Sequence, residues 1–219
     1  MKNFLVLTII LMLGACGRVV AQDAAAASKR ANQQYVLFES ERDKGTNVTG
    51  MYSYLLDSYE NFMKVVEAPD NGQYLSGAKN RLRAMYPYLL NGAVYYSEQK
   101  QPSKALDFAA AYIEMPRLKI FQSELLPKDN RYASVVYYAA VSAYNLQKYS
   151  QALKYFQEYL STGTDTQQKD CYVYMNMIYQ SQKNYSEQER VLEEAIAKYP
   201  VSLDFLYNLV NCLLYTSDA

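Results

Sequence analysis

The chain has 219 residues, and half of them are apolar, so it can bury a core and is not a disordered segment. Its 22 basic and 22 acidic residues cancel, which gives no sign of the basic patch that nucleic-acid-binding proteins usually carry. Histidine is absent, so the commonest general base and metal ligand is missing. We therefore expect no enzyme, no metal site and no cofactor.

Residues 1–21 have the pattern of an export signal. Lys2 supplies a positive charge, the run from Phe4 to Leu13 is apolar apart from a threonine, and small residues follow at Gly14 and Ala15. The run is too short to span a bilayer, which takes about 20 apolar residues.

Two cleavage sites compete within this leader. A signal peptidase that reads Val19-Val20-Ala21 would release the chain before Gln22, whereas Leu13-Gly14-Ala15-Cys16 resembles a bacterial lipobox, in which Cys16 becomes lipidated. Both predict an exported protein, in the periplasm or at the outer membrane of a Gram-negative-type bacterium. Membrane contact is expected only through a lipid on Cys16.

Residues 22–86 are predicted to form helical hairpins. The alanines after Asp23, which can cap a helix, begin the first one. A second helix covers about 50–66, with Thr49 available as its N-cap. Pro87 is expected to bend or split the helical stretch over 74–99 that follows.

The remainder is also predicted to be helical. The strongest case for a strand is Val135–Tyr138, because valine and tyrosine favour strands. Ala139, Ala140, Ala143 and Leu146 nevertheless continue a 3.6-residue face beyond it, so a helix is expected.

An internal repeat appears in the second half of the chain. The segments Tyr149–Phe156 and Tyr185–Leu192 both begin with Tyr-Ser and open an amphipathic helix, 36 residues apart. This offset is close to a 34-residue repeat period.

The spacing of aromatic and small residues resembles the tetratricopeptide repeat over residues 87–211. The clearest copy has Tyr172, Met175-Asn176, Tyr179, Gln188-x-x-x-Leu192, Ala195 and Pro200; the preceding copy has Val136, Ala139-Ala140, Ala143, Ala152-x-x-x-Phe156 and Tyr159; an earlier, weaker copy has Leu89, Gly92-Ala93, Tyr96, Ala105-x-x-x-Ala109 and Tyr112. Between the last two lies an expected insertion at 115–130. The resemblance implies an all-α fold, a right-handed α-solenoid of antiparallel helical hairpins.

Two residues depart from the pattern in the clearest copy. Asn176 replaces a glycine and Gln188 replaces a small alanine, which leaves open how that hairpin packs. Cys171 is expected to be a buried free thiol, with a bridge to Cys212 as the alternative. Acidic clusters around Glu39 and around Glu187–Glu194 are expected to be solvated helix faces.

The carboxyl terminus predicts a truncated array. The helix after Pro200 has no partner helix, and solenoid ends normally carry a polar cap. Residues 212–219 resemble the conceptual translation of a transposon-end sequencing adaptor, so we expect genuine sequence to end near Asn211; the alternative is a genuine helix end. The genomic locus would distinguish them.

The resemblance also implies a concave groove lined by the first helix of each repeat. In register, its candidate partner-binding residues are Asn91 and Ser97, then Tyr138, Tyr144 and Asn145, then Tyr174 and Gln180. Further positions in the same row are Val94, Glu98, Val141, Met177 and Ser181. The row holds no Lys or Arg, so it does not resemble the type of tetratricopeptide groove that binds a peptide's terminal carboxylate.

Aromatic and amide side chains suit extended peptide backbone or the faces of sugars. We therefore expect a protein-protein interaction scaffold of the periplasm or outer envelope that binds a protein or peptide segment. The alternatives are a glycan-binding envelope lipoprotein and a face that packs against further repeats.

Overall fold

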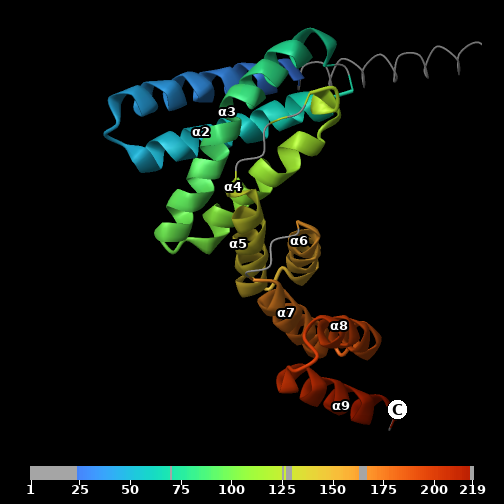
Figure 1. Ribbon diagram of the computed structural model, residues 1–219. Helices are drawn as coiled ribbons and strands as arrows, with labels where there is room; N and C mark the ends of the chain where they lie inside the picture. The colour runs from blue at the N-terminus through green and yellow to red at the C-terminus, as the bar shows by residue number, and fades with distance from the viewer. Residues whose placement is uncertain (1–23, 70, 125, 127–129, 163–166, 218–219) are drawn as a thin grey trace, which may run out of the picture. The chain divides into compact units, whose positions relative to one another are not determined.

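The computed structural model describes residues 24–69, 71–124, 126, 130–162 and 167–217, and within these ranges every regular element is a helix (Figure 1). In chain order these are a helix over 24–44, α2 (Val48–Glu67), α3 (Gly72–Glu98), α4 (Pro102–Glu114), the 3₁₀ turns η1 (Met115–Arg117) and η2 (Lys119–Phe121), α5 (Tyr132–Asn145), α6 (Tyr149–Ser161), α7 (Gln168–Ser181), α8 (Tyr185–Lys198) and α9 (Leu203–Ser217). The all-α prediction is confirmed, including the helix at Val135–Tyr138.

The chain divides into two compact units. The first comprises Met1–Val94 and Ala111–Pro127, and the second comprises Tyr95–Ala110 and Lys128–Ala219. The division falls inside α3 and inside α4, so each of these helices contributes to both units.

In the first unit the helix over 24–44 packs on both α2 and α3. The buried Ser58 hydroxyl of α2 donates to the Ala31 carbonyl at 2.9 Å. The Phe38 ring meets the Tyr88 ring of α3 edge-on, with centroids 5.1 Å apart. These contacts bury the apolar faces that the helical periodicity predicts.

One local prediction in this unit is corrected, and another is narrowed to a bend at Pro87, since the helix is not split there. Asn47, not Thr49, caps α2, because its side chain accepts a hydrogen bond from the Gly50 backbone N–H at 2.9 Å. Pro87 lies inside α3 without splitting it. Pro87 is exposed, so the hydrogen bond it cannot make is lost on the solvent side, where water can replace it.

The predicted insertion between α4 and α5 contains η1 and η2, and its residues 115–127 belong to the first unit. Met115 and Phe121 are fully buried. Glu124, beyond η2, accepts from the Lys79 ammonium at 2.7 Å and from the Arg83 guanidinium. The segment is therefore fastened to α3 by apolar burial and by charge.

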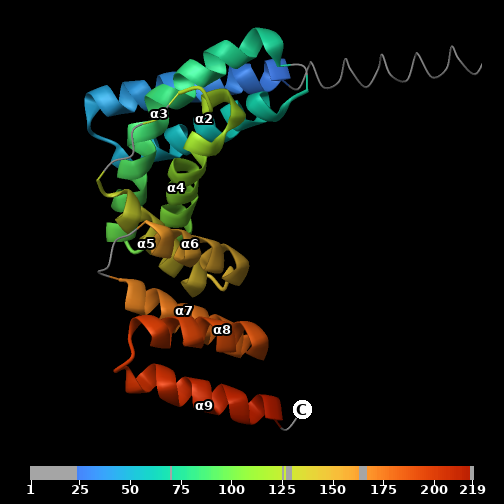
Figure 2. The ribbon, with the colours of Figure 1, turned by 45° about the vertical axis from the view of Figure 1, so that its right-hand side comes forward.

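In the second unit each helix from α5 to α9 packs against the next one in sequence, as in a solenoid (Figure 2). The turns that join α3 to α4, α5 to α6 and α7 to α8 share one geometry. Lys100, Gln147 and Lys183 each have φ near +55°, at 54°, 57° and 54°.

A matching hydrogen bond closes each of these three turns. The carbonyls of Tyr96, Ala143 and Tyr179 each accept from the backbone N–H five residues on, at 2.9 Å in all three. These carbonyls occupy one position of the predicted register, and the turns are spaced by 47 and 36 residues, as the repeat copies are. The backbone thus bears out the register of antiparallel hairpins, while the handedness of the superhelix stays a prediction.

The two departures from the repeat pattern contact each other. Asn176 on α7 and Gln188 on α8 are both buried, and the Gln188 Nε2 donates to the Asn176 Oδ1 at 2.9 Å. In the preceding hairpin the equivalent positions are the buried Ala140 and Ala152. An amide pair thus replaces a pair of small residues, and it leaves the Gln188 Oε1 without a hydrogen-bond partner.

Both described cysteines, Cys171 and Cys212, are free and buried, so the predicted free thiol at 171 is confirmed and the alternative bridge is absent. Burial raises the pKa of the Cys171 thiol to about 12, with a further contribution from the Asp170 carboxylate. The thiol is therefore protonated and packs as a small apolar group.

Candidate functional site

The predicted row of binding residues in the second unit is partly exposed and partly structural. On α5, Tyr138 is 56% exposed and Asn145 is exposed. On α7, Met177 is 43% exposed and Gln180 is exposed. We call this set, together with Tyr144 and Tyr174, the tyrosine face.

Tyr144 and Tyr174 are half-buried and join α5 to α7. Their rings meet edge-on with centroids 4.9 Å apart, and the Tyr144 hydroxyl lies 4.0 Å from the Met177 sulfur. Tyr174 also stacks on the buried Phe156 of α6 at 5.2 Å. These two predicted site residues therefore fix the spacing between hairpins, and the exposed side chains stand on that support.

The other two predicted residues lie on α3. Asn91 and Ser97 are both exposed, and Asn91 belongs to the first unit whereas Ser97 belongs to the second. The tyrosine face as defined from α5 and α7 includes neither.

A neutral phenol lies beside the tyrosine face. Tyr137 donates to the Asp170 carboxylate at 3.4 Å, and its ring packs on Tyr159 and against Tyr138. Burial, and then the Asp170 charge, raise the pKa of the Tyr137 hydroxyl well above its usual value. It therefore stays a donor at all physiological pH.

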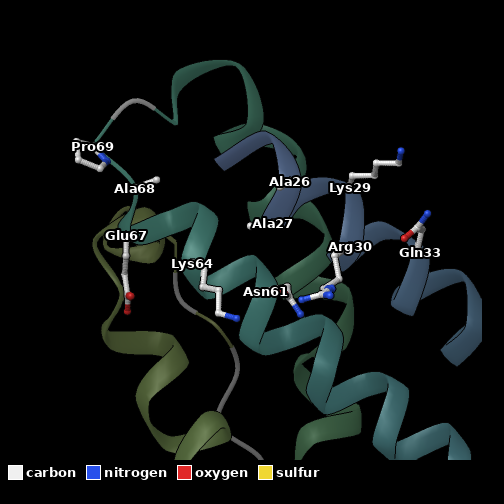
Figure 3. Close-up of a pocket in the computed structure, with 10 residues that line it drawn as sticks. All are labelled: Ala26, Ala27, Lys29, Arg30, Gln33, Asn61, Lys64, Glu67, Ala68 and Pro69. Atoms are coloured by element: carbon white, nitrogen blue, oxygen red, sulfur yellow. The ribbon is translucent and has the colours of Figure 1, made fainter. Parts of the chain in front are cut away.

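The first unit holds a groove that the sequence did not predict (Figure 3). It lies between the helix over 24–44 and α2 and has a volume of about 700 Å³. Three alanines and a proline line it together with the polar residues Lys29, Arg30, Gln33, Asn61, Lys64 and Glu67. We call it the cationic groove.

Helical spacing explains half of this groove. Lys29, Arg30 and Gln33 share one side of their helix, and this pattern is visible in the sequence. Asn61 and Lys64 share a side of α2 in the same way. The two sets line one groove only because the two helices pack against each other. That packing is not visible in the sequence.

The acidic clusters are paired with cations. Arg190 bonds Glu187 at 2.9 Å and Glu194 at 2.5 Å, and Arg42 lies 4.0 Å from Glu39. Among the described residues no group of three or more metal-ligating side chains gathers at one place. No helix formed by the described residues is both long enough and apolar enough to cross a bilayer.

Two predicted features lie outside the described residues. Residues 1–21 with Cys16, and the last two residues of the 212–219 segment, are not described. The lipid on Cys16 and the origin of that tail stay predictions.

No family model and no curated protein matches this chain. Among solved structures, a tetratricopeptide repeat protein from Parabacteroides merdae ATCC 43184 is similar, at 15% identity and a TM-score of 0.37. The match covers 86% of this chain and 74% of that chain.

Proposed function

We propose that this chain is a helical-repeat scaffold that binds a segment of another protein on the tyrosine face of α5 and α7. The observation that carries the proposal is the exposure of Tyr138, which leaves more than half of a large aromatic side chain in solvent. Met177, Asn145 and Gln180 of the same face are exposed as well.

Such a surface suits protein recognition. Aromatic side chains and methionine are enriched in the centres of protein interfaces, and charged residues are depleted there. Amide side chains can donate to and accept from an extended backbone. Because Tyr144 and Tyr174 are held between helices, the surface loses little side-chain freedom on binding.

The proposed location is the periplasm or outer envelope, reached through the leader at residues 1–21. The mass of the mature chain tests this location. A chain that starts at Gln22 indicates release, and one that starts at a lipidated Cys16 indicates an anchored lipoprotein. A mature chain that retains Met1 would contradict both.

Site-specific photo-crosslinking tests the binding surface. A photoreactive phenylalanine analogue replaces Tyr138 in the full chain, expressed in its native host, and the adduct is identified by mass spectrometry. Gln157, exposed on α6, is the matched control position. We expect one discrete protein adduct at 138 and none at 157.

Equal adducts at both positions would contradict the proposal. So would saturable binding of the purified chain to a glycan array, lost on Tyr138→Ala, without any protein adduct. That result would favour the glycan-binding alternative, since tyrosine and amide side chains also suit sugar faces.

A further inference from the structure

The cationic groove of the first unit has a chemistry that the tyrosine face lacks. Lys29, Arg30 and Lys64 line it from two helices, and among the described residues none of the three has an ion-pair partner. The side chains of Arg30 and Lys64 point toward Asn61, whereas Lys29 extends outward at the edge (Figure 3). We infer that this groove binds an acidic segment of a partner protein. The inference does not rest on the proposed function, because the two surfaces lie in different units and are tested through different residues.

The first unit does not lack carboxylates to neutralise its cations. Arg42, Lys79 and Arg81, for example, all pair with acids of the same unit. Three cations and one carboxylate, that of Glu67, line the groove, and the carboxylate points away from the cations (Figure 3). The uncompensated positive charge is therefore concentrated where the surface is hollow, and an incoming carboxylate would relieve the repulsion between Arg30 and Lys64.

Amide groups complete the site for an anion. Asn61 is only 8% exposed and lines the groove. Its Nδ2 donates one hydrogen to the Asp57 carbonyl at 2.7 Å, which fixes the side chain and leaves its second hydrogen for a ligand. Carboxylates bind most strongly where amide and cationic donors converge on them.

A second, shallower site on the helix over 24–44 adjoins the groove and offers two apolar side chains to a ligand. Lys29 and Gln33 line both, and Val36 and Leu37, which are 59% and 43% exposed, line the second, whose volume is about 550 Å³. From Arg30 to Leu37 the helix rises about 10 Å, which equals roughly three residues of extended chain. The expected ligand thus has an acidic residue and an apolar residue about three positions apart.

Two other occupants fit less well. The leader over 1–23 carries Lys2 and Arg18 and only one acid, Asp23, so its charge is not complementary. An anionic bilayer would attract the same cations, but lipid contact needs protruding residues, whereas this site is a hollow between two helices with a buried amide in its wall.

Fluorescence anisotropy with the purified mature chain tests the inference. The probe is a labelled peptide EESSLS, and the controls are QQSSLS and EESSSS. We expect the first peptide to bind, with an affinity that falls as NaCl is raised from 50 to 300 mM, and each control to bind roughly 10-fold more weakly or worse.

Two double variants decide whether the groove is the site. Arg30→Gln with Lys64→Gln should weaken binding of EESSLS by roughly 10-fold or more. Lys100→Gln with Lys119→Gln makes the same change in net charge at exposed positions outside the groove and should leave binding within about 2-fold. Tyr138→Ala should also leave it unchanged.

Three outcomes would overturn the inference. The first is that EESSLS does not bind. The second is that the two double variants weaken its binding equally. The third is that the chain cosediments with phosphatidylglycerol vesicles, that the Arg30→Gln and Lys64→Gln double variant abolishes this cosedimentation, and that the peptide does not bind. The last outcome assigns the groove to a membrane surface.

Discussion

The two units of this chain are built from the same kind of helix but are held together differently. The second unit repeats one hairpin, with the same positive-φ turn at Lys100, Gln147 and Lys183. The described residues of the first unit show no such repeat, and charged contacts such as Glu124 with Lys79 fasten an irregular segment to α3. Their exposed faces differ in the same sense, aromatic in the second unit and cationic in the first.

This contrast shows how far a local sequence repeat determines which side chains are exposed together. Where each hairpin packs only on its neighbours, the spacing of residues in the sequence sets which side chains share a face. Where the chain folds back on itself, as the segment ending at Glu124 does, the surface depends on contacts between distant residues.

Core truncations should have the largest effect, and the effect should stay within a unit. Phe156→Ala removes the ring that supports Tyr174, and Phe121→Ala removes the anchor of the irregular segment. Each substitution should lower the free energy of unfolding of its own unit by roughly 3–5 kcal/mol. Hydrogen exchange should rise in α6 and α7 for the first variant and in α3 for the second.

The two variants control for each other. Equal loss of protection throughout the chain in both would contradict the division into units and would indicate a single cooperative structure.

Substitutions of Asn176 and Gln188 should have strongly non-additive effects on stability. Asn176→Gly or Gln188→Ala alone leaves a buried polar group without its partner, at a cost of about 1–3 kcal/mol. The double variant restores the small residues of the repeat pattern and should recover most of that loss. Urea unfolding of the four proteins measures the coupling, and strictly additive effects would contradict a direct pairing.

Glycine in the repeated turns should stabilise the second unit slightly. At Gln147 and Lys183 a non-glycine residue adopts a left-handed conformation, so Gln147→Gly and Lys183→Gly should each add about 0.5–1 kcal/mol. Alanine at the same positions is the matched control and should not stabilise. Thermal melting measures both, and destabilisation by glycine would show that the positive φ of Gln147 and Lys183 does not cost stability.

The smallest expected effect concerns the charged contact of the first unit. Hydrogen bonds from Lys79 and then Arg83 lower the pKa of Glu124 below its usual value. Its contribution to stability is therefore present above the ordinary glutamate pKa of about 4.3 and is lost as the pH falls through the lowered value. Glu124→Gln should lower the melting temperature by a small amount at pH 7.

The pH dependence identifies the cause of that difference. The gap between wild type and Glu124→Gln should close as the pH falls below about 4. Glu60→Gln, at an exposed carboxylate of α2 without an ion pair among the described residues, should show no gap at pH 7. A gap that persists at pH 2.5 would mean that the carboxylate charge is not its source.

The fold was predictable where local spacing decides it. The helical period of Ala139, Ala140 and Ala143 outweighed the strand preference of the valines before them, and the structure has a helix there. The repeat offsets also predicted where the turns fall. Thr49 was the wrong cap because Asn47 can bond the same turn of α2, a choice that propensity does not settle.

The candidate site was predictable only in part. The register placed Tyr138 and Gln180 on exposed faces, but Tyr144 and Tyr174 proved to be packing residues as well, since contacts between helices are not visible in one helix. The cationic groove was missed for the same reason. Lys64 and Arg30 are distant in sequence and meet only when two helices pack.

Hydrogen exchange of the full chain, with and without the protein partner recovered by crosslinking at Tyr138, tests the central claim most directly. We expect protection in peptides from α5 and α7 that include Tyr138 and Gln180, and unchanged exchange in peptides from α6 and α8. Protection confined to α6 and α8, or none at saturating partner, would contradict the tyrosine face as the binding surface.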